Sequence, residues 1–124
     1  MKTILNLSGH SLITETVEAL QVELRDDDIN VIDQKVSIRR RLPVYTQIKD
    51  ILSPHNEELR SGRRVYVILP GLKIAAGCVL AYIHGVSGRF PTAVELVRDP
   101  DEGVYGLHAI HDLEIYRQEA RNER

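Results

Sequence analysis

The sequence predicts an α/β fold: a three-layer, Rossmann-like and mostly parallel sheet that ends in a C-terminal antiparallel hairpin. Two observations predict it. Apolar runs typical of strands alternate with segments of helical periodicity, in the order β-α-β-α-β-α-β-β-α. The 124 residues, 43% hydrophobic and 27% charged, have the composition of an ordinary globular protein with enough chain for one core. We therefore expect a single domain over residues 1–124.

The first elements are a strand, a helix and a second strand. Residues 4–7 are an apolar run, and residues 13–24 carry apolar side chains at helical spacing before an acidic turn at 26–28. Residues 29–36 mix apolar and polar positions, as a half-exposed strand does, whereas residues 65–69 are apolar throughout, as an interior parallel strand is. We expect the second strand at an edge of the sheet.

The segment between these two strands is predicted to hold two helices. Residues 45–52 have one apolar helix face, which ends at Ser53-Pro54 because the residue before a proline is pushed out of the helical region. Proline also suits the first turn of a new helix, and a short one is expected to run to about Arg60 and to close at Gly62.

The C-terminal half begins with a helix over 72–84 that is apolar almost all round and stops in the glycine-rich segment 85–88. A strand, a turn, a last strand and a helix capped by Asp112 follow, the first three over 92–97, 99–103 and 104–110. Right-handed crossovers, with the second strand at an edge, give the spatial strand order 2-1-3-4-5.

The composition excludes several classes of protein. A formal net charge of −2 argues against a protein that coats long DNA or RNA, which needs a large basic excess. The single cysteine, Cys78, favours a reducing compartment and a role as a small buried hydrophobe. Residues 1–2 lead into the first strand without a signal-peptide pattern, and the apolar segment 74–83 is far shorter than the about 20 residues that span a bilayer. We expect a cytoplasmic protein with no membrane partner.

Two loops form the candidate binding site. In the predicted order the sheet reverses between the first and third strands, and open α/β sheets bind ligands at that point, outside the carboxyl ends of the strands. Each loop opens a helix, whose free N–H groups favour anions, and glycine lets a ligand approach the backbone. The residues concerned are Ser8, Gly9, His10 and Ser11 after the first strand, and Gly71 and Lys73 after the third.

Three arginines are predicted on the same rim. Arg39, Arg40 and Arg41 follow the second strand, and the planar fork of an arginine binds phosphate through two hydrogen bonds. Each of these features alone is more often a simple turn or a solvated face. Their convergence on one rim is what favours a small ligand that carries phosphate.

The known nucleotide motifs are absent, since there is neither a Walker A run nor a G-x-G-x-x-G. His10 is the one ionisable ring predicted at the rim, where it would act on a proton or a phosphate, or have no chemical role at all. His108 and His111 lack companion cysteines, and His55 is expected in solvent. We predict no metal site and no other cofactor.

The helix over 72–84 has more apolar surface than one face of a sheet can cover. Ala75, Ala76 and Gly77 would allow close packing of a second copy, which favours a homodimer or a higher homo-oligomer. The alternative is that the C-terminal helix covers this surface.

Three segments resemble a known family. They are LNLSGHSL at 5–12, LPGLKIAAGCVLAYIHG at 69–85 and GRFPTAVEL at 88–96. They resemble the small CRISPR-associated Csx proteins of type III systems, in particular the fifteenth Csx family, over about half of the chain. The Leu-Pro-Gly…His-Gly…Gly-x-Phe-Pro string is the most specific part. Ser11 stands where a proline would be expected, and residues 39–64 resemble nothing that can be placed.

The resemblance implies a Rossmann-like domain related to the CARF sensors and acting on cyclic oligoadenylates, the second messengers of type III CRISPR defence. In that class a symmetric ring commonly sits on a two-fold axis between subunits. Residues 8–11 would then line the ligand, with Gly71 and Lys73 opposite. The stretch from His84 to Pro91 would lie at the other edge of the sheet, as a helix stop and core anchor.

Three functions remain open at this point. The first is a binding module that captures cyclic tetra-adenylate and lowers its free concentration, as a sponge, and needs no catalytic group. The second is a metal-independent ring nuclease, in which each 2′-hydroxyl attacks the neighbouring phosphate to give a 2′,3′-cyclic phosphate. Lys73 or an arginine would stabilise charge, and His10 would assist proton transfer. The third is a structural or regulatory dimer that binds no nucleotide.

Overall fold

A single five-stranded sheet organises the chain, in a computed structural model that describes residues 1–124. The strands lie in the order β2-β1-β3-β4-β5, with the first four parallel and β5 antiparallel to β4. This is the predicted order, with β2 at an edge. The strands are β1 (Lys2–Asn6), β2 (Ile29–Asp33), β3 (Tyr66–Ile68), β4 (Thr92–Arg98) and β5 (Tyr105–Asp112).

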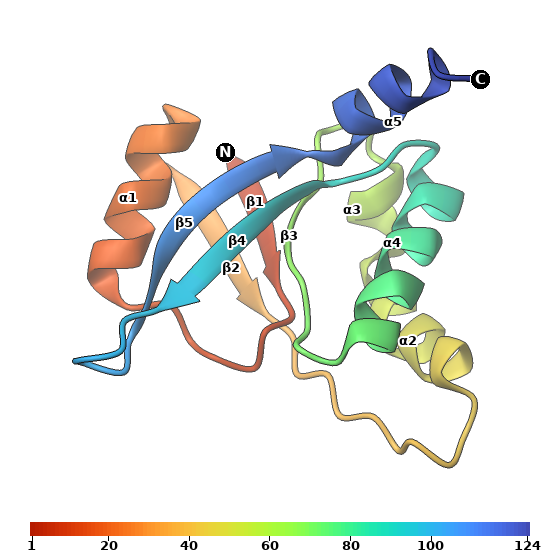
Figure 1. The fold of residues 1–124 in the computed structure, drawn as a ribbon, viewed down its shortest axis with the longest axis horizontal. Coiled ribbons are helices and arrows are strands. Elements are labelled where there is room, and N and C mark those ends of the chain that lie inside the picture. Colours follow the sequence, from red (N-terminus) through yellow and green to blue (C-terminus); the bar gives the residue numbers. More distant parts are fainter.

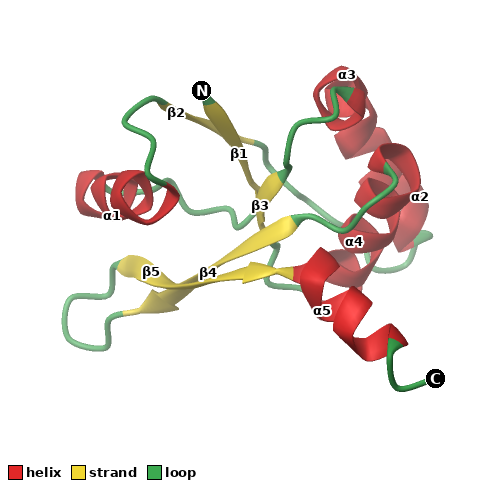
Figure 2. Cartoon of the chain, turned by 90° about the horizontal axis from the view of Figure 1, so that it is seen from above, coloured by secondary structure: helices red, strands yellow, loops and turns green.

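Helices cover both faces of the sheet, which confirms the three-layer, Rossmann-like fold class. Figure 1 shows α1 beside one face, and Figure 2 shows α2, α3 and α4 gathered on the other. The helices are α1 (Thr14–Leu24), α2 (Val44–Leu52), α3 (Asn56–Arg60), α4 (Lys73–Ser87) and α5 (Leu113–Arg121), with a 3-10 turn over Ser53–His55. None of the helices has the length and hydrophobicity that crossing a membrane requires.

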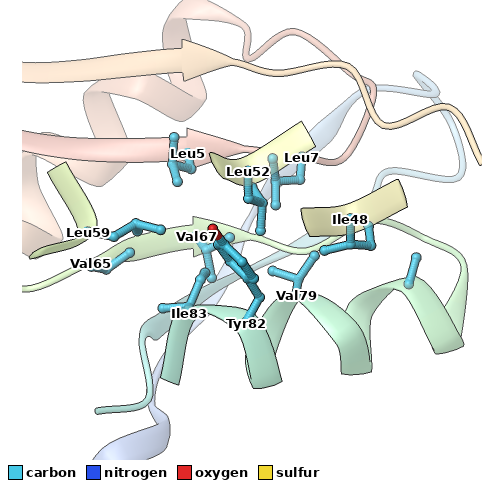
Figure 3. Packing of buried hydrophobic residues seen from close by; sticks show 11 residues of the cluster. Leu5, Leu7, Ile48, Leu52, Leu59, Val65, Val67, Val79, Tyr82 and Ile83 are labelled. Carbon is cyan, nitrogen blue, oxygen red and sulfur yellow. The ribbon is translucent and has the colours of Figure 1, made fainter. Parts of the chain in front are cut away.

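The core is divided by the sheet into two clusters, because alternate residues of a strand point to opposite faces. The larger cluster has 11 buried residues and fills the space between β1, β3 and the helices α2 to α4 (Figure 3). Leu5, Val67 and Ile83 meet there. The smaller cluster packs α1 against the other face. Leu20 of α1 meets Ile4 of β1 there, together with Tyr66 and other apolar side chains of β2 to β5.

Several element boundaries differ from the sequence prediction. The second strand ends at Asp33 and not at residue 36, and residues 34–43 form a loop. The helix predicted to stop at 85–88 continues through Gly85 to Ser87. The chain leaves the helix at Gly88, whose φ of 83° lies in the left-handed region that glycine adopts without strain.

The C-terminal helix is docked at its first turn. Asp112 is the N-cap, as predicted, because its side chain accepts the N–H of Ile115. No residue of α5 is buried, and the helix leaves the outer side of α4 uncovered. On that side Ile74 is 59% exposed, and Gly77 and Ala81 are exposed as well.

Candidate functional site

The loop after β1 is held in shape by a buried asparagine. Asn6 is 3% exposed and uses its amide completely. Its Nδ2 donates to the carbonyl oxygen of His10 (2.7 Å) and to Oδ1 of Asp33 (2.8 Å), and its Oδ1 accepts from the backbone N–H (3.1 Å) and the hydroxyl (2.6 Å) of Ser8. One side chain therefore joins the ends of β1 and β2 to the loop that begins the candidate site.

The exposed ring of His10 projects from this loop onto the β4–β5 hairpin. Gly9 has a φ of 82°, which turns the chain sharply just before His10. The imidazole then stacks on the ring of Tyr105 in β5, with the ring centroids 4.4 Å apart and the planes 22° from parallel. The loop after β1 therefore contacts β5, the strand at the far edge of the sheet.

A cavity of about 570 Å³ opens between this loop, the turn from β3 into α4, and the hairpin. Its size is within the usual range of small-molecule sites. Eight of its 13 lining residues are hydrophobic. The 13 lining residues are Ser8, His10, Ile68, Leu69, Gly71, Leu80, Ala93, Val94, Glu95, Leu96, Tyr105, His111 and Leu113.

The cavity exists because β3 is short. β3 ends at Ile68 and pairs with β4 only at Thr92 and Ala93, because the chain then turns into α4 through Leu69, Pro70 and Gly71. From Val94 onward β4 has β5 as its single neighbour, so its other edge faces the cavity. Figure 2 shows β4 diverging from β3 at this point.

A second cavity lies between the carboxyl ends of β1 and β2. It measures about 350 Å³ and shares His10 with the first. Lys35 is the basic residue in its wall, and Asp33 is the acidic one. Lys35 takes part in none of the structure's ion pairs, so its ammonium group has no carboxylate partner.

A hydrogen-bonded group of three side chains lies at the hairpin side of the first cavity. His111 of β5 bonds through Nε2 to Oε1 of Glu95 in β4 (2.8 Å) and through Nδ1 to the hydroxyl of Tyr116 in α5 (3.0 Å). The hydrogen bond from His111 holds the pKa of Glu95 below its ordinary value of 4.5, and the charges of His108 and His111 add to this effect. An ionised carboxylate accepts only, so Nε2 of His111 carries the proton.

The structure brings together part of the predicted site. Ser8, His10 and Gly71 line the first cavity, while Gly9 and Ser11 line the second. Lys73 is exposed at the first residue of α4 and lines neither cavity. The helix N-terminus has no side-chain cap, so the N–H groups of its first turn are free for an anion beside Gly71.

The arginine segment lies outside both cavities. Arg39, Arg40 and Arg41 belong to the loop that runs out from the sheet beneath α2 (Figure 1), and none of them lines a cavity that contains His10. The loop is fixed by Gln47, whose side-chain oxygen accepts the Arg39 N–H (2.8 Å) and whose amide donates to the Arg39 carbonyl (2.9 Å). The arginines make no ion pair.

Comparison with known proteins was negative at all three levels. No family model, no curated protein and no solved structure matches the chain. The resemblance to the Csx proteins therefore remains a prediction.

Two further histidines have structural partners. His55, expected in solvent, is half-buried and bonds through Nε2 to Oε1 of Gln34 (2.9 Å). The ring of His84 packs on Phe90, with centroids 4.4 Å apart. The backbone N–H of Phe90 donates to Glu114 (3.0 Å), which ties α5 to the loop before β4. No three His, Cys, Asp or Glu side chains come together as metal ligands would.

Sequence reasoning missed Asn6, Tyr105 and the Glu95–His111 pair. Asn6 could have been noticed, because it is the one polar residue in the apolar run of β1. The other three depend on the register of the β4–β5 hairpin. That register contains a bulge, since Glu95 pairs with Ala109 but the next residue of β4 pairs with Leu107.

Proposed function

We propose that this protein binds a cyclic oligoadenylate, with cyclic tetra-adenylate as the expected ring, and acts as a sponge that lowers its free concentration. The observation that carries the proposal is the cavity between the loops after β1 and β3. It lies at the reversal point of the strand order, where open α/β sheets bind ligands. Its apolar walls suit a nucleobase, and its mouth has the polar loop of Ser8 and His10.

The charges around the rim favour a polyanion. Lys35 lines the second cavity and Lys73 begins α4 two residues after Gly71, and neither has a carboxylate within ion-pairing distance. The three arginines of the 34–43 loop are also unpaired but lie outside both cavities. Glu95 is the acidic group inside the cavity, and its carboxylate is bonded to His111. A phosphate between the Ser8 loop and Gly71 would therefore face His10 and the free N–H groups at the start of α4, while the carboxylates of Glu95 and Asp33 are bonded to His111 and Asn6.

The size of the cavity favours an assembly. A volume of about 570 Å³ suits a ligand of drug size, and a ring of four nucleotides is larger. One chain then encloses part of the ring, and a homodimer would enclose the rest. The uncovered outer side of α4, with Ile74, Gly77 and Ala81 exposed, allows close approach of a second copy.

The test is a binding and recovery experiment. Purified protein is mixed with radiolabelled cyclic tetra-adenylate at substoichiometric and excess ratios, and bound ligand and products are followed over time. Tight binding with intact ligand supports the sponge. His10→Ala should weaken binding, while His108→Ala is the matched control, since His108 is exposed and lines neither of the two cavities that share His10. Failure to bind any cyclic oligoadenylate selects the structural dimer.

A ring nuclease is the second candidate, and one observation favours it. The imidazole of His10 lines the cavity and stacks on Tyr105 without using a ring nitrogen in a hydrogen bond, so it can take up or give a proton in the attack of a 2′-hydroxyl on its phosphate. The O2′–P bond forms as the P–O5′ bond breaks, leaving a 2′,3′-cyclic phosphate and a 5′-hydroxyl. Conversion of many equivalents in the same experiment, abolished by His10→Ala, would establish it.

A further inference from the structure

We infer that the open edge of β4 recognises the base of the bound nucleotide through its backbone, with the carbonyl oxygen of Val94 and the N–H of Leu96 as the recognising pair. This inference rests on the proposed function and adds to it the means of base recognition.

The direction of these backbone groups follows from the sheet. The N–H of Thr92 donates to the carbonyl of Val65 (2.8 Å), so it points toward β3. Backbone groups alternate in direction along a strand, so Val94 points to the same side as Thr92. The alternation continues past the register shift after Glu95, since the N–H of Asp99 donates across the hairpin to Val104 (2.7 Å), and Leu96 therefore also points away from β5. The β3–β4 ladder has ended before Leu96, and no backbone hydrogen bond outside the regular elements involves Val94 or Leu96.

Both residues line the cavity, and Val94 is only 2% exposed. Backbone donors and acceptors in such a place are costly unless something pairs with them. The C=O of one strand residue and the N–H of the residue two positions on present an acceptor and a donor side by side. A planar heterocycle with a donor beside an acceptor complements this pair, and adenine has one in its amino group and N1.

A base fits this space better than an added peptide strand does. The loop of Ser8 and His10 and the turn at Gly71 both line the cavity beside the open edge of β4. An extended strand would have to pass through both. The flanking side chains of Ile68, Leu96 and Leu113 offer apolar contact to the faces of a flat ring.

The first experiment uses adenosine monophosphate as the probe. ¹⁵N-labelled protein is titrated with it and with purine riboside monophosphate, which lacks the amino group. We expect the Leu96 amide signal to move downfield with adenosine monophosphate. The Val97 amide, which points toward β5, is the internal control. The analogue should bind about tenfold more weakly, because one hydrogen bond is lost and the Val94 carbonyl is left unpaired.

The second experiment removes the donor. Leu96→Pro deletes the N–H and should still fold, because proline is tolerated where the N–H of a strand faces away from its neighbour. Leu96→Ala keeps the N–H and loses only the side chain, so it is the matched control. We expect Leu96→Pro to bind adenosine monophosphate about tenfold more weakly than Leu96→Ala. If Leu96→Pro unfolds while Leu96→Ala folds, the N–H has a partner in the ladder and the inference is wrong.

The outcomes separate this inference from the function on which it rests. Shifts elsewhere in the cavity with an unmoved Leu96 amide overturn base recognition by β4 and leave the proposed function standing. A shifted Leu96 amide without any binding of cyclic tetra-adenylate supports the base site and overturns the ring as ligand. If neither nucleotide moves a cavity amide, both proposals are wrong.

Discussion

Replacing Asn6 tests whether one buried amide organises the candidate site. Asn6→Ala removes four hydrogen bonds, of 2.6 to 3.1 Å, and leaves the Asp33 carboxylate and the Ser8 N–H without their partner. Net contributions of about 0.5–1.5 kcal/mol per bond, reduced because water reaches the loop, give a loss of about 2–4 kcal/mol in the free energy of unfolding. Asn30→Ala, at an exposed position of β2, should stay within about 0.5 kcal/mol of the native protein.

A second variant, Asn6→Asp, tests the same role of Asn6 through the pH dependence of stability. It keeps the shape of the side chain but puts a second carboxylate where the amide nitrogen lies 2.8 Å from Asp33. Like charges that close repel by about 6 kcal/mol at an effective dielectric constant of about 20, and by less where solvent reaches Asp33. The pair would therefore share a proton, and the pKa of one carboxyl would rise above its unfolded value of about 3.9.

The sign of the pH effect follows from that raised pKa. The folded variant binds the proton more tightly than the unfolded chain, so its stability is fully present at low pH and is lost as pH rises through the raised value. Urea unfolding followed by circular dichroism at pH 4, 5.5 and 7 would measure it. We expect Asn6→Asp to fall relative to Asn6→Ala across that range. Parallel behaviour of the two variants, or an Asn6→Ala loss under about 0.5 kcal/mol, would refute the reasoning.

Three further predictions concern the scaffold. Gly88→Ala should cost about 1–2 kcal/mol because its φ is 83°, whereas Gly85→Ala, inside α4 with nothing within 4 Å of the added carbon, should stabilise by about 0.5–1 kcal/mol; urea midpoints compare them. Ile83→Ala should cost about 2–5 kcal/mol, since Ile83 is fully buried, and a value near zero would contradict the core assignment. The hydrogen bond from the Phe90 N–H lowers the pKa of Glu114 below 4.5, so the native protein should lose stability as pH falls through that lowered pKa. In Glu114→Gln the free energy of unfolding, measured with urea at several acidic pH values, should depend less on pH.

The fold was predictable because its signals are local and repeat. The apolar run of β1, the helical spacing of α1 and the proline at 54 each act within a few residues, and the strand order then follows from general rules of connection. Boundaries were less predictable where two effects compete. Gly85 has a low helix propensity, yet α4 continues past it to Ser87. Val86, the residue after Gly85, packs against the larger cluster, and this packing outweighs the propensity.

Of the candidate site, only the part formed by the loops after β1 and β3 could be predicted from the sequence. The loops at Ser8 and Gly71 could be placed together because β1 and β3 are neighbours. The relative positions of Glu95 and His111 depend on the register between β4 and β5, which contains a bulge. The residue pattern within either strand does not determine that register. The arginines were expected on the rim, but the 34–43 loop that carries them is fixed by Gln47, a residue whose role depends on tertiary position.

The shortness of β3 links the sequence to the proposed ligand. Leu69-Pro70-Gly71 ends the strand and turns the chain into α4: the proline has no N–H for a ladder with β1, toward which Ile68 points by accepting the N–H of Leu7 (2.9 Å). A longer β3 would pair with Val94 and Leu96, fill the cavity and leave the loop of His10 beside a closed sheet. The same three residues that stop the strand therefore create the apolar space, expose the edge of β4 and bring an uncapped helix N-terminus to its mouth.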